Sequence, residues 1–317
     1  MIARRATLAA GAALLAAPAL GQPRWPDRPI EIQVGFTAGG GTDLDARSYA
    51  RALEKRIGGS VVVTNRAGAG GELALAAVAR ARPDGHTLGT TNFPGLLTIP
   101  IERQAQFRLE DFAPLGNLVK DPSAITVHAE SPHRTLADLL AAARAAPERL
   151  TYASPGVGSD DHMQLVLMEA ATGIRMTHVV FQGDPQLRQA VLGRQVDCTG
   201  LNLGAVLQVP DNLRLLAHAG AARSRFRPDV PTLTELGIPV VMGSERGVVA
   251  PAGTPAPILA RLREATEDIA RDAEFMQQLE GRFTEPAWEP GEAWFTRLRG
   301  QAAEYRALWQ RTPWAQR

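Results

Sequence analysis

The glycines near the N-terminus have the composition of an anion-binding loop. Gly39, Gly40 and Gly41 separate a segment of alternating apolar and polar residues from a segment with helical periodicity. The first N–H groups of a helix have no partner within the helix, and the helix dipole places partial positive charge there. Glycines lack a Cβ atom, so a ligand can approach such a backbone closely. The pattern predicts a site for a small anion such as a carboxylate.

The same arrangement occurs a second time. The segment from Ser154 to Ser159, with Gly156 and Gly158, follows a predicted strand at 150–153 and leads into a predicted helix at 160–172. If these two helix ends face each other across a cleft, they hold the two ends of one anionic molecule.

Motifs of catalysis and cofactor binding are absent from the sequence. Leu44 and Asp161 stand where a dinucleotide fingerprint would need its third glycine. There is no P-loop and no Gly-x-Ser-x-Gly motif, and the six histidines lack zinc-ligand spacing. Cys198 is the single cysteine, so no disulfide forms within the chain. We expect no catalytic residues, no cofactor and no bound metal.

The net charge indicates which partners the protein can bind, and the first 21 residues indicate its location in the cell. The 317 residues carry 34 basic and 33 acidic side chains, which gives no electrostatic footprint for nucleic acid. Residues 1–21 contain Arg4 and Arg5, a short apolar run and small residues at the end, a pattern typical of a secretory signal peptide. The run is too short to span a bilayer, which takes about 20 residues. We expect a periplasmic protein that begins near Gln22, exported by the general or the twin-arginine route.

The periodicity predicts two α/β lobes. Strands at 30–34, 60–64 and 87–91 alternate with helices at 42–57 and 70–82. The pattern restarts with strands at 124–127, 150–153, 177–181, 196–199 and 213–217 and helices at 135–146, 160–172 and 185–192. A strand at 247–250 and long helices at 255–279 and 291–309 complete the chain. We assign residues 22–123 and 247–317 to lobe 1 and residues 124–246 to lobe 2. Two crossings between the lobes predict a hinge and a ligand cleft.

Several polar residues have two interpretations. Asp45 fits the capping box Thr42-x-x-Asp45, so we predict a structural role for it. Asp43 either contacts a ligand or braces the loop. Asp160 and Asp161 are first-turn acids that favour the helix dipole, or one of them meets a ligand ammonium. His162 either contacts the ligand or packs behind its loop.

The order and spacing of short motifs resemble one family over nearly the whole mature chain. The motifs are Gly39-Gly40-Gly41-Thr42-Asp43, Asn65-Arg66-Ala67-Gly68-Ala69-Gly70-Gly71, Pro83-Asp84-Gly85-His86-Thr87, Gln195-Val196-Asp197 and Pro228-Asp229-Val230-Pro231-Thr232. Together they resemble the extracytoplasmic solute-binding proteins of tripartite tricarboxylate transporters, the Bug family.

This resemblance implies a periplasmic binding protein-like fold of type II, a Venus flytrap of two Rossmann-like lobes. It implies a monomer that captures a small carboxylate (a di- or tricarboxylate, an aromatic carboxylate or an acidic amino acid) for membrane permease subunits or for a sensor. The alternative is a periplasmic transferase or hydrolase on the same fold, and turnover of the ligand distinguishes the two.

The resemblance also assigns the ligand contacts. They are Phe36, Thr37, Ala38, Gly39, Gly40, Gly41, Thr42, Asp43, Thr91, Ser154, Gly156, Gly158, Ser159, His162, Phe181, Gln182, Gly183 and Asn202. Gln182 stands where family members usually have lysine, which removes a charged contact from that position.

Overall fold

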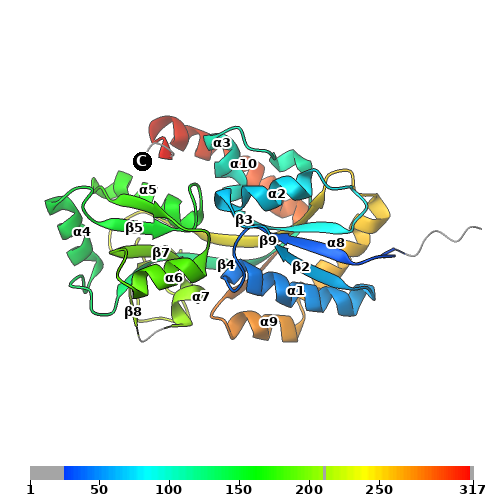
Figure 1. The fold of residues 1–317 in the computed structure, drawn as a ribbon, viewed down its shortest axis with the longest axis horizontal. Coiled ribbons are helices and arrows are strands. Elements are labelled where there is room, and N and C mark those ends of the chain that lie inside the picture. The colour runs from blue at the N-terminus through cyan, green and yellow to red at the C-terminus, as the bar shows by residue number, and fades with distance from the viewer. Residues whose placement is uncertain (1–24, 210–211, 315–317) are drawn as a thin grey trace, which may run out of the picture.

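The computed structural model describes residues 25–209 and 212–314. The predicted signal peptide and the start near Gln22 lie outside these residues. Two α/β lobes lie side by side, and two strands connect them, one of which pairs with strands of both lobes (Figure 1). These strands are β4 (Phe112–His128) and β9 (Gly243–Pro251), which pair antiparallel.

Lobe 1 is a sheet with the order β2-β1-β3-β9-β4. Its strand β1 pairs parallel with both β2 and β3, as the alternation of strands and helices predicts. The side chains of Ile30, Ile32 and Val34 are fully buried and Gln33 is 2% exposed, so both faces of β1 are covered. The helices α1 and α2 cover opposite faces of this sheet (Figure 1). The bounds are β1 (Ile30–Val34), α1 (Gly41–Ile57), β2 (Val61–Asn65), η1 (Ala69–Gly71), α2 (Glu72–Ala79), β3 (Thr87–Phe93), α3 (Gly95–Glu102) and η2 (Leu109–Asp111).

Lobe 2 repeats the design with the order β6-β5-β7-β4-β8. Its strand β5 is parallel to β6 and β7, whereas β4 is antiparallel to β7 and β8. The bounds are α4 (Leu136–Ala145), β5 (Thr151–Ser154), α5 (Asp160–Thr172), β6 (Thr177–Val180), α6 (Asp184–Leu192), β7 (Cys198–Asn202), α7 (Leu203–Leu207) and β8 (Leu213–His218).

The last part of the chain differs from the single helix predicted at 255–279. Two helices, α8 (Ala256–Ala270) and α9 (Ala273–Glu280), replace it. The break falls at Asp272, whose Oδ1 accepts a hydrogen bond from the N–H of Phe275 at 3.0 Å and caps the second helix. A strand that the sequence did not predict, β10 (Glu285–Pro290), then pairs with β4, and α10 (Gly291–Arg311) follows.

The end of the chain contacts both lobes. Trp294 and Phe295 of α10 are buried in a core cluster of lobe 1. Trp314 is fully buried in the cluster formed by residues of lobe 2, and its Nε1 donates to Glu102 Oε2 at 3.0 Å. Helix α10 therefore begins on lobe 1 and the chain after it packs against lobe 2.

Replacing Trp314 with phenylalanine should destabilise the protein by about 1.5–3 kcal/mol, since it removes a hydrogen bond to a carboxylate. Urea unfolding monitored by far-ultraviolet circular dichroism, which reports the backbone, measures the change in unfolding free energy. Arg311→Ala, at an exposed position nearby, is the control. A loss below about 0.5 kcal/mol, the usual range of surface substitutions, would contradict this anchoring role.

Candidate functional site

The N-terminus of α1 meets a carboxylate from the other lobe. The helix begins after Gly40, which has no side-chain cap, and the preceding Gly39 has a φ of +81° that glycine adopts without strain. The N–H of Gly41 donates to Oδ2 of Asp184 at 3.0 Å. Asp184 is the first residue of α6 in lobe 2. The predicted anion-binding end of α1 therefore holds an anion of this chain.

Two neighbouring cavities lie between the lobes and share Phe36 and Pro155 in their walls. The inner cavity has a volume of about 10 Å³ and is bordered by Phe36, Gly40, Gly41, Thr42, Asn92, Pro155, Asp160, Asp184 and Asn202. The outer cavity has a volume of about 380 Å³ and is bordered by Gly35, Phe36, Gly68, Ala69, Gly70, Glu102, Arg103, Pro155, Gly156, Val157, Val180, Phe181 and Gln182.

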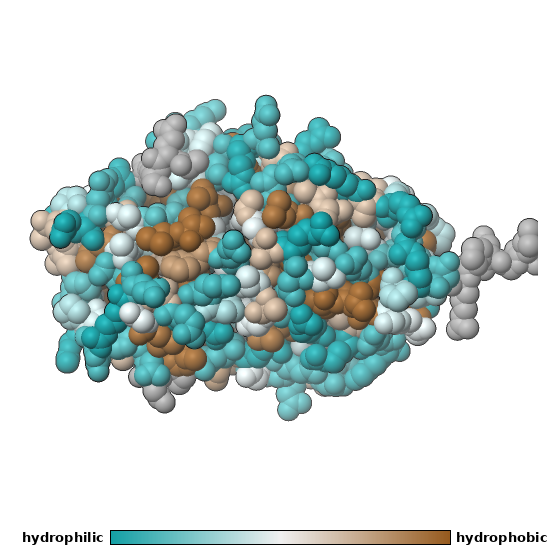
Figure 2. All heavy atoms as spheres, in the orientation of Figure 1, coloured by the Kyte–Doolittle hydropathy of each residue, from teal (hydrophilic) through white to brown (hydrophobic). Residues whose placement is uncertain are grey.

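The outer cavity has an apolar rim on the side of lobe 2. Val180 is 51% exposed, and Phe181 follows it at the cavity border. Figure 2 shows that hydrophobic side chains gather near the middle of this face, whereas hydrophilic side chains dominate its outline. An apolar border next to a few polar groups is a usual property of small-molecule sites.

Glycines allow the lobes to touch around these cavities. A Cβ atom on Gly156 would lie 2.8 Å from the Cα of Gly70 in lobe 1. Thr98 Oγ1 of lobe 1 donates to the carbonyl oxygen of Gly158 at 2.5 Å. A Cβ atom on Gly183 would lie 2.5 Å from Thr37 Oγ1. The structure thus shows the lobes in contact on both sides of the cleft.

The N-terminus of α5 is capped by its own chain. Ser159 Oγ accepts from the N–H of His162 at 3.2 Å. Asp160 is 3% exposed, and its Oδ2 accepts from Asn202 Nδ2 at 2.6 Å and from Ser123 Oγ at 2.9 Å. Burial raises the pKa of Asp160, although both donors favour its charged form.

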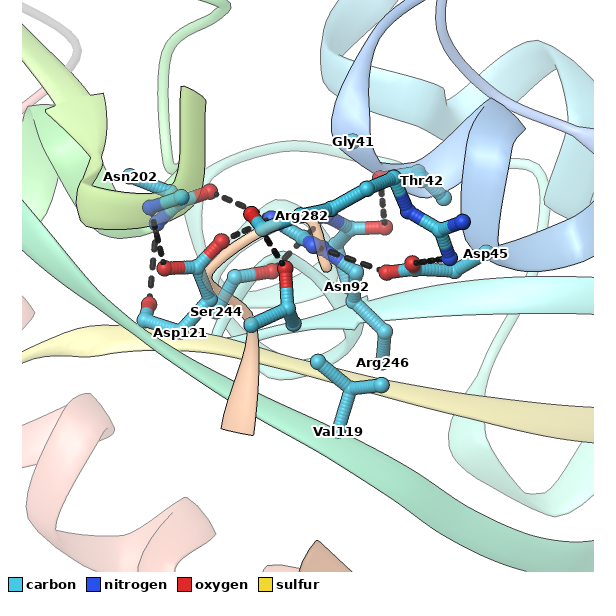
Figure 3. Close-up of polar contacts among 12 residues, drawn as sticks. Gly41, Thr42, Asp45, Asn92, Val119, Asp121, Asn202, Ser244, Arg246 and Arg282 are labelled. Atoms are coloured by element: carbon cyan, nitrogen blue, oxygen red, sulfur yellow. Dashed lines mark hydrogen bonds and ion pairs between the residues drawn. The ribbon is translucent and has the colours of Figure 1, made fainter. Parts of the chain in front are cut away.

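A buried arginine connects the lobes beneath the inner cavity (Figure 3). Arg246, on β9, is 4% exposed and donates to Asp45 Oδ2 at 2.9 Å, to Asp121 Oδ2 at 3.0 Å and to Asn202 Oδ1 at 2.8 Å. Burial opposes its charge, but the carboxylates of Asp121 and Asp45 raise the pKa of Arg246. Arg282 donates to the other oxygen of Asp45 at 2.9 Å.

The capping box predicted for Asp45 is wrong. The residue before α1 is Gly40, and no side chain caps the helix. Both oxygens of Asp45 instead accept from Arg246 and Arg282, because a buried guanidinium needs a carboxylate partner, whereas the helix end already has Asp184 as the acceptor for the N–H of Gly41. Thr42 Oγ1 donates to Asn92 Oδ1 at 3.2 Å.

The stability of the protein should fall as the pH rises through about 7. Burial raises the pKa of Asp121 to about 7, although Arg246 and the N–H of Gly204 favour its charged form. An unfolded carboxyl group has a pKa near 4, so between about pH 4 and 7 the folded protein binds a proton that the unfolded chain has released. This contribution is complete below the unfolded pKa and is lost as the pH passes the folded pKa.

Urea unfolding at pH 6 and pH 8 of the wild type and of Asp121→Asn measures this effect. Histidines titrate in both proteins, so the difference between the two isolates Asp121. We expect the wild type to lose more unfolding free energy than the variant over this interval; parallel changes would exclude a raised pKa at this position.

Asp43 braces the glycine loop. Its side chain is buried, and it accepts from the N–H of Gly39 at 2.9 Å, from Arg47 Nε at 3.0 Å and from Asn65 Nδ2 at 2.9 Å. Burial acts to raise its pKa, but Arg47 and the N–H of Gly39 hold the pKa of Asp43 below its usual value. These contacts support the bracing interpretation.

Two histidines lie behind the second loop. The ring of His162 stacks on His178 with 4.1 Å between centroids, and its Nδ1 accepts from the N–H of Gly158 at 3.1 Å. His178 Nε2 and Ser154 Oγ are 2.7 Å apart. Burial lowers the pKa of His178 to about 4, so this ring is neutral at pH 7. The geometry supports packing of His162 behind the loop.

The structure brings part of the predicted contact set to the cleft. The inner cavity is bordered by Phe36, Gly40, Gly41, Thr42 and Asn202, and the outer one by Phe36, Gly156, Phe181 and Gln182. Neither of these two cavities is bordered by Thr37, Ala38, Gly39, Asp43, Thr91, Ser154, Gly158, Ser159, His162 or Gly183. Thr91 is fully buried within the sheet, where its Oγ1 donates to the carbonyl oxygen of Gly247 at 3.4 Å.

Other cleft residues were not predicted. Asn92 and Asp184 border the inner cavity, and Arg103 borders the outer one. Asn92 lies near the carboxyl end of the parallel strand β3, where ligands of α/β sheets usually bind, so topology alone provided a signal for it. Asp184 directly precedes the helix predicted at 185–192, and no local pattern marks it as a cleft residue.

Two other kinds of site do not occur among residues 25–209 and 212–314. In this part of the chain no group of three or more His, Cys, Asp or Glu side chains is placed to hold a metal ion. No helix there is long and apolar enough to cross a membrane.

Two α/β lobes, two connecting strands and a cleft bordered by helix N-termini form the fold of two-lobed periplasmic binding proteins. A structure of Rpa4515 from R. palustris with adipate is similar, with a TM-score of 0.82, 28% identity and coverage of 90% of this chain and 96% of that one. So is MatC from Rhodopseudomonas palustris with bound malate, with a TM-score of 0.82, 25% identity and coverage of 90% and 99%.

The sequence matches over residues 46–298 the family described as the tripartite tricarboxylate transporter family receptor, TctC. The UPF0065 protein in the gbd 5′ region of Cupriavidus necator is 36% identical over 83% of this chain and 82% of that protein. BugT of Bordetella pertussis is 33% identical over 75% of each. The chain belongs to the TctC family of solute-binding receptors, which confirms the resemblance and the fold expected from the sequence.

Proposed function

We propose that this protein is a periplasmic receptor that closes its two lobes around a small carboxylate and delivers it to a tripartite tricarboxylate-type permease or to a sensor. The observation that carries the proposal is the cleft itself. Gly40 and Gly41 of lobe 1 border the inner cavity, and Gly156 of lobe 2 borders the outer cavity. Around these cavities the two lobes touch through glycines. The similar structures with adipate and malate support a carboxylate as ligand.

If the protein were an enzyme, Ser154 and His178 would be its candidate catalytic dyad, but the burial of Ser154 argues against this role. Ser154 Oγ lies 2.7 Å from His178 Nε2, as a nucleophile and base would. However, Ser154 is fully buried, accepts from the N–H of Gly156 at 3.3 Å and borders neither interlobe cavity. A substrate in the cleft does not reach this hydroxyl, which supports a receptor.

Native mass spectrometry of the purified protein, followed by denaturation, tests this function. We expect a small carboxylate retained without chemical change, and a smaller radius of gyration by X-ray scattering in its presence. Conversion of the retained molecule during incubation would support the enzyme instead.

Export can be measured separately. The signal pattern of residues 1–21 predicts a mature protein that begins near Gln22 in the periplasmic fraction. Intact mass and N-terminal sequencing of that fraction determine the start. A chain that keeps Arg4 and Arg5 in the membrane fraction would contradict a released receptor.

A further inference from the structure

The cleft is acidic where the sequence predicted anion binding. The N–H of Gly41 already donates to Asp184 Oδ2 at 3.0 Å. Asp160, at the start of α5, borders the same inner cavity as Asp184 and is 3% exposed. Both predicted anion-binding helix ends therefore present a carboxylate of this chain to the cavity between them.

No cation of the described residues neutralises these two carboxylates by direct contact. Arg246 is the nearby arginine beneath the cavity, and its terminal nitrogens donate to Asp45, Asp121 and Asn202. In the described part of the chain, neither Asp160 nor Asp184 lies within 4.0 Å of an arginine, lysine or histidine nitrogen in an ion pair. A ligand carboxylate placed here would meet two carboxyl groups that have no ion-pair partner and on which Arg246 acts only from beyond ion-pair distance.

The size of the inner cavity selects the group that fits. Its volume of about 10 Å³ is close to the minimum needed for one water molecule. An ammonium nitrogen has nearly the size of a water molecule, whereas a carboxylate has three heavy atoms. The outer cavity of about 380 Å³ has room for the rest of a small ligand, and its border includes Gly68, Gly70, Gly156 and Gln182 together with the charged residues Glu102 and Arg103.

We propose that Asp184 is the specificity-determining residue of the cleft and selects a ligand with a cationic nitrogen next to its carboxylate. The nitrogen enters the inner cavity between Asp184 and Asp160, and the carboxylate stays in the outer cavity. This inference rests on the proposed function, since it concerns the same cleft. The ligand class is an amino carboxylate rather than a simple di- or tricarboxylate.

Matched ligands that differ only by an ammonium group test the inference. Isothermal titration compares L-aspartate with succinate, L-glutamate with glutarate and L-2-aminoadipate with adipate. We expect the wild type to bind the amino member of at least one pair roughly tenfold tighter or more, as a charge-assisted hydrogen bond predicts. Asp184→Asn keeps an oxygen for the N–H of Gly41 but removes the charge. It should lose that preference and bind the nitrogen-free partner more tightly than the wild type does.

Asp268→Asn is the control variant. It changes the net charge by the same amount at an exposed position of α8, so it should bind like the wild type. If the wild type binds a nitrogen-free carboxylate as tightly as its amino partner or more tightly, the inference is overturned while the proposed function stands. If no member of the three pairs binds, the inference is overturned, and the identity of the molecule retained by the purified protein decides the proposed function. An unchanged preference in Asp184→Asn would also overturn the role of Asp184.

Discussion

Replacing Arg246 with methionine is expected to destabilise the protein by about 3–5 kcal/mol, the usual effect of removing one partner from a buried ion pair. Methionine has a similar length and fills the space beside β9, so the loss comes from charge. The variant leaves Asp45 and Asp121, 8% and 2% exposed in their side chains, without their main cation. Arg282 still contacts Asp45, whereas Asp121 keeps only the N–H of Gly204.

The effect should shrink at low pH, because an orphaned buried carboxyl group can then be protonated. Urea unfolding at pH 8 measures the loss of stability, and unfolding at pH 5 measures how far this loss shrinks. Arg306→Met, at an exposed position of α10, is the control and should change stability by less than about 0.5 kcal/mol.

A second substitution identifies the cause of the loss. In the double variant Arg246→Met with Asp121→Asn, the buried charge that lost its partner is gone, so part of the stability should return. A single variant within about 1 kcal/mol of the wild type, or a double variant whose losses simply add, would show that Arg246 acts by packing rather than by charge.

Arg246 also fixes the position of strand β9 relative to the two lobes. It lies on β9, which pairs with β4 at Asp121 and Ser244, and it reaches lobe 1 through Asp45 and lobe 2 through Asn202. Asn92 of lobe 1 donates to Ser244 Oγ at 2.9 Å in the same region. If the lobes move when the proposed ligand is released, these bonds must be kept or exchanged, so we expect the hinge to lie beside the inner cavity.

Local signals predicted most of the regular elements. The strand at 30–34 and the helix at 160–172 have the bounds expected from periodicity. Thr135 and Asp138, which lie three residues apart as a capping box requires, form both of its hydrogen bonds at the start of α4. Such features depend on neighbours in the sequence and not on the rest of the fold.

Elements that depend on the fold were missed or shortened. The strand predicted at 124–127 is the end of β4, which has 17 residues and contains Pro114, Gly116 and Pro122. Proline and glycine argue against a strand when only the local sequence is considered. Pairing with β9 and β10 keeps these residues of β4 in a strand. Strand β10, with prolines at 286 and 290, likewise forms because it pairs with β4.

The candidate site also combines features that the local sequence predicts with features that depend on the fold. Glycine loops that border the cleft were predicted from their composition, but the groups that determine its charge were not. Gly41 and Asp184 are 143 residues apart in the chain, and Asp45 and Arg246 are 201 apart. No spacing rule connects such pairs, so Asp45 was assigned to the nearest threonine, and the acidic character of the cleft became visible only in the folded chain.

Replacing Gly156 with alanine is expected to prevent the lobes from closing and to weaken ligand binding roughly 100-fold. The added Cβ atom would lie 2.8 Å from the Cα of Gly70 and 3.3 Å from its nitrogen, both backbone atoms of the opposite lobe. Backbone cannot rotate away as a side chain does, so overpacking here costs about 3 kcal/mol, which corresponds to this loss of affinity. Gly156 also has a φ of +158°, so alanine strains this loop even in the open form, and the stability of the variant has to be measured beside its affinity.

Titration with the ligand that the wild type retains measures the affinity, and scattering measures closure. The radius of gyration of Gly156→Ala should stay at the open value when ligand is added, and its melting temperature without ligand measures how far the strained loop destabilises the open form. Gly300→Ala, a helical glycine with open space around it, is the control: it should bind normally and gain about 0.5–1 kcal/mol of stability. If Gly156→Ala closes and binds like the wild type, the contact between Gly156 and Gly70 is not part of the ligand-bound state, and the cleft must close by another route.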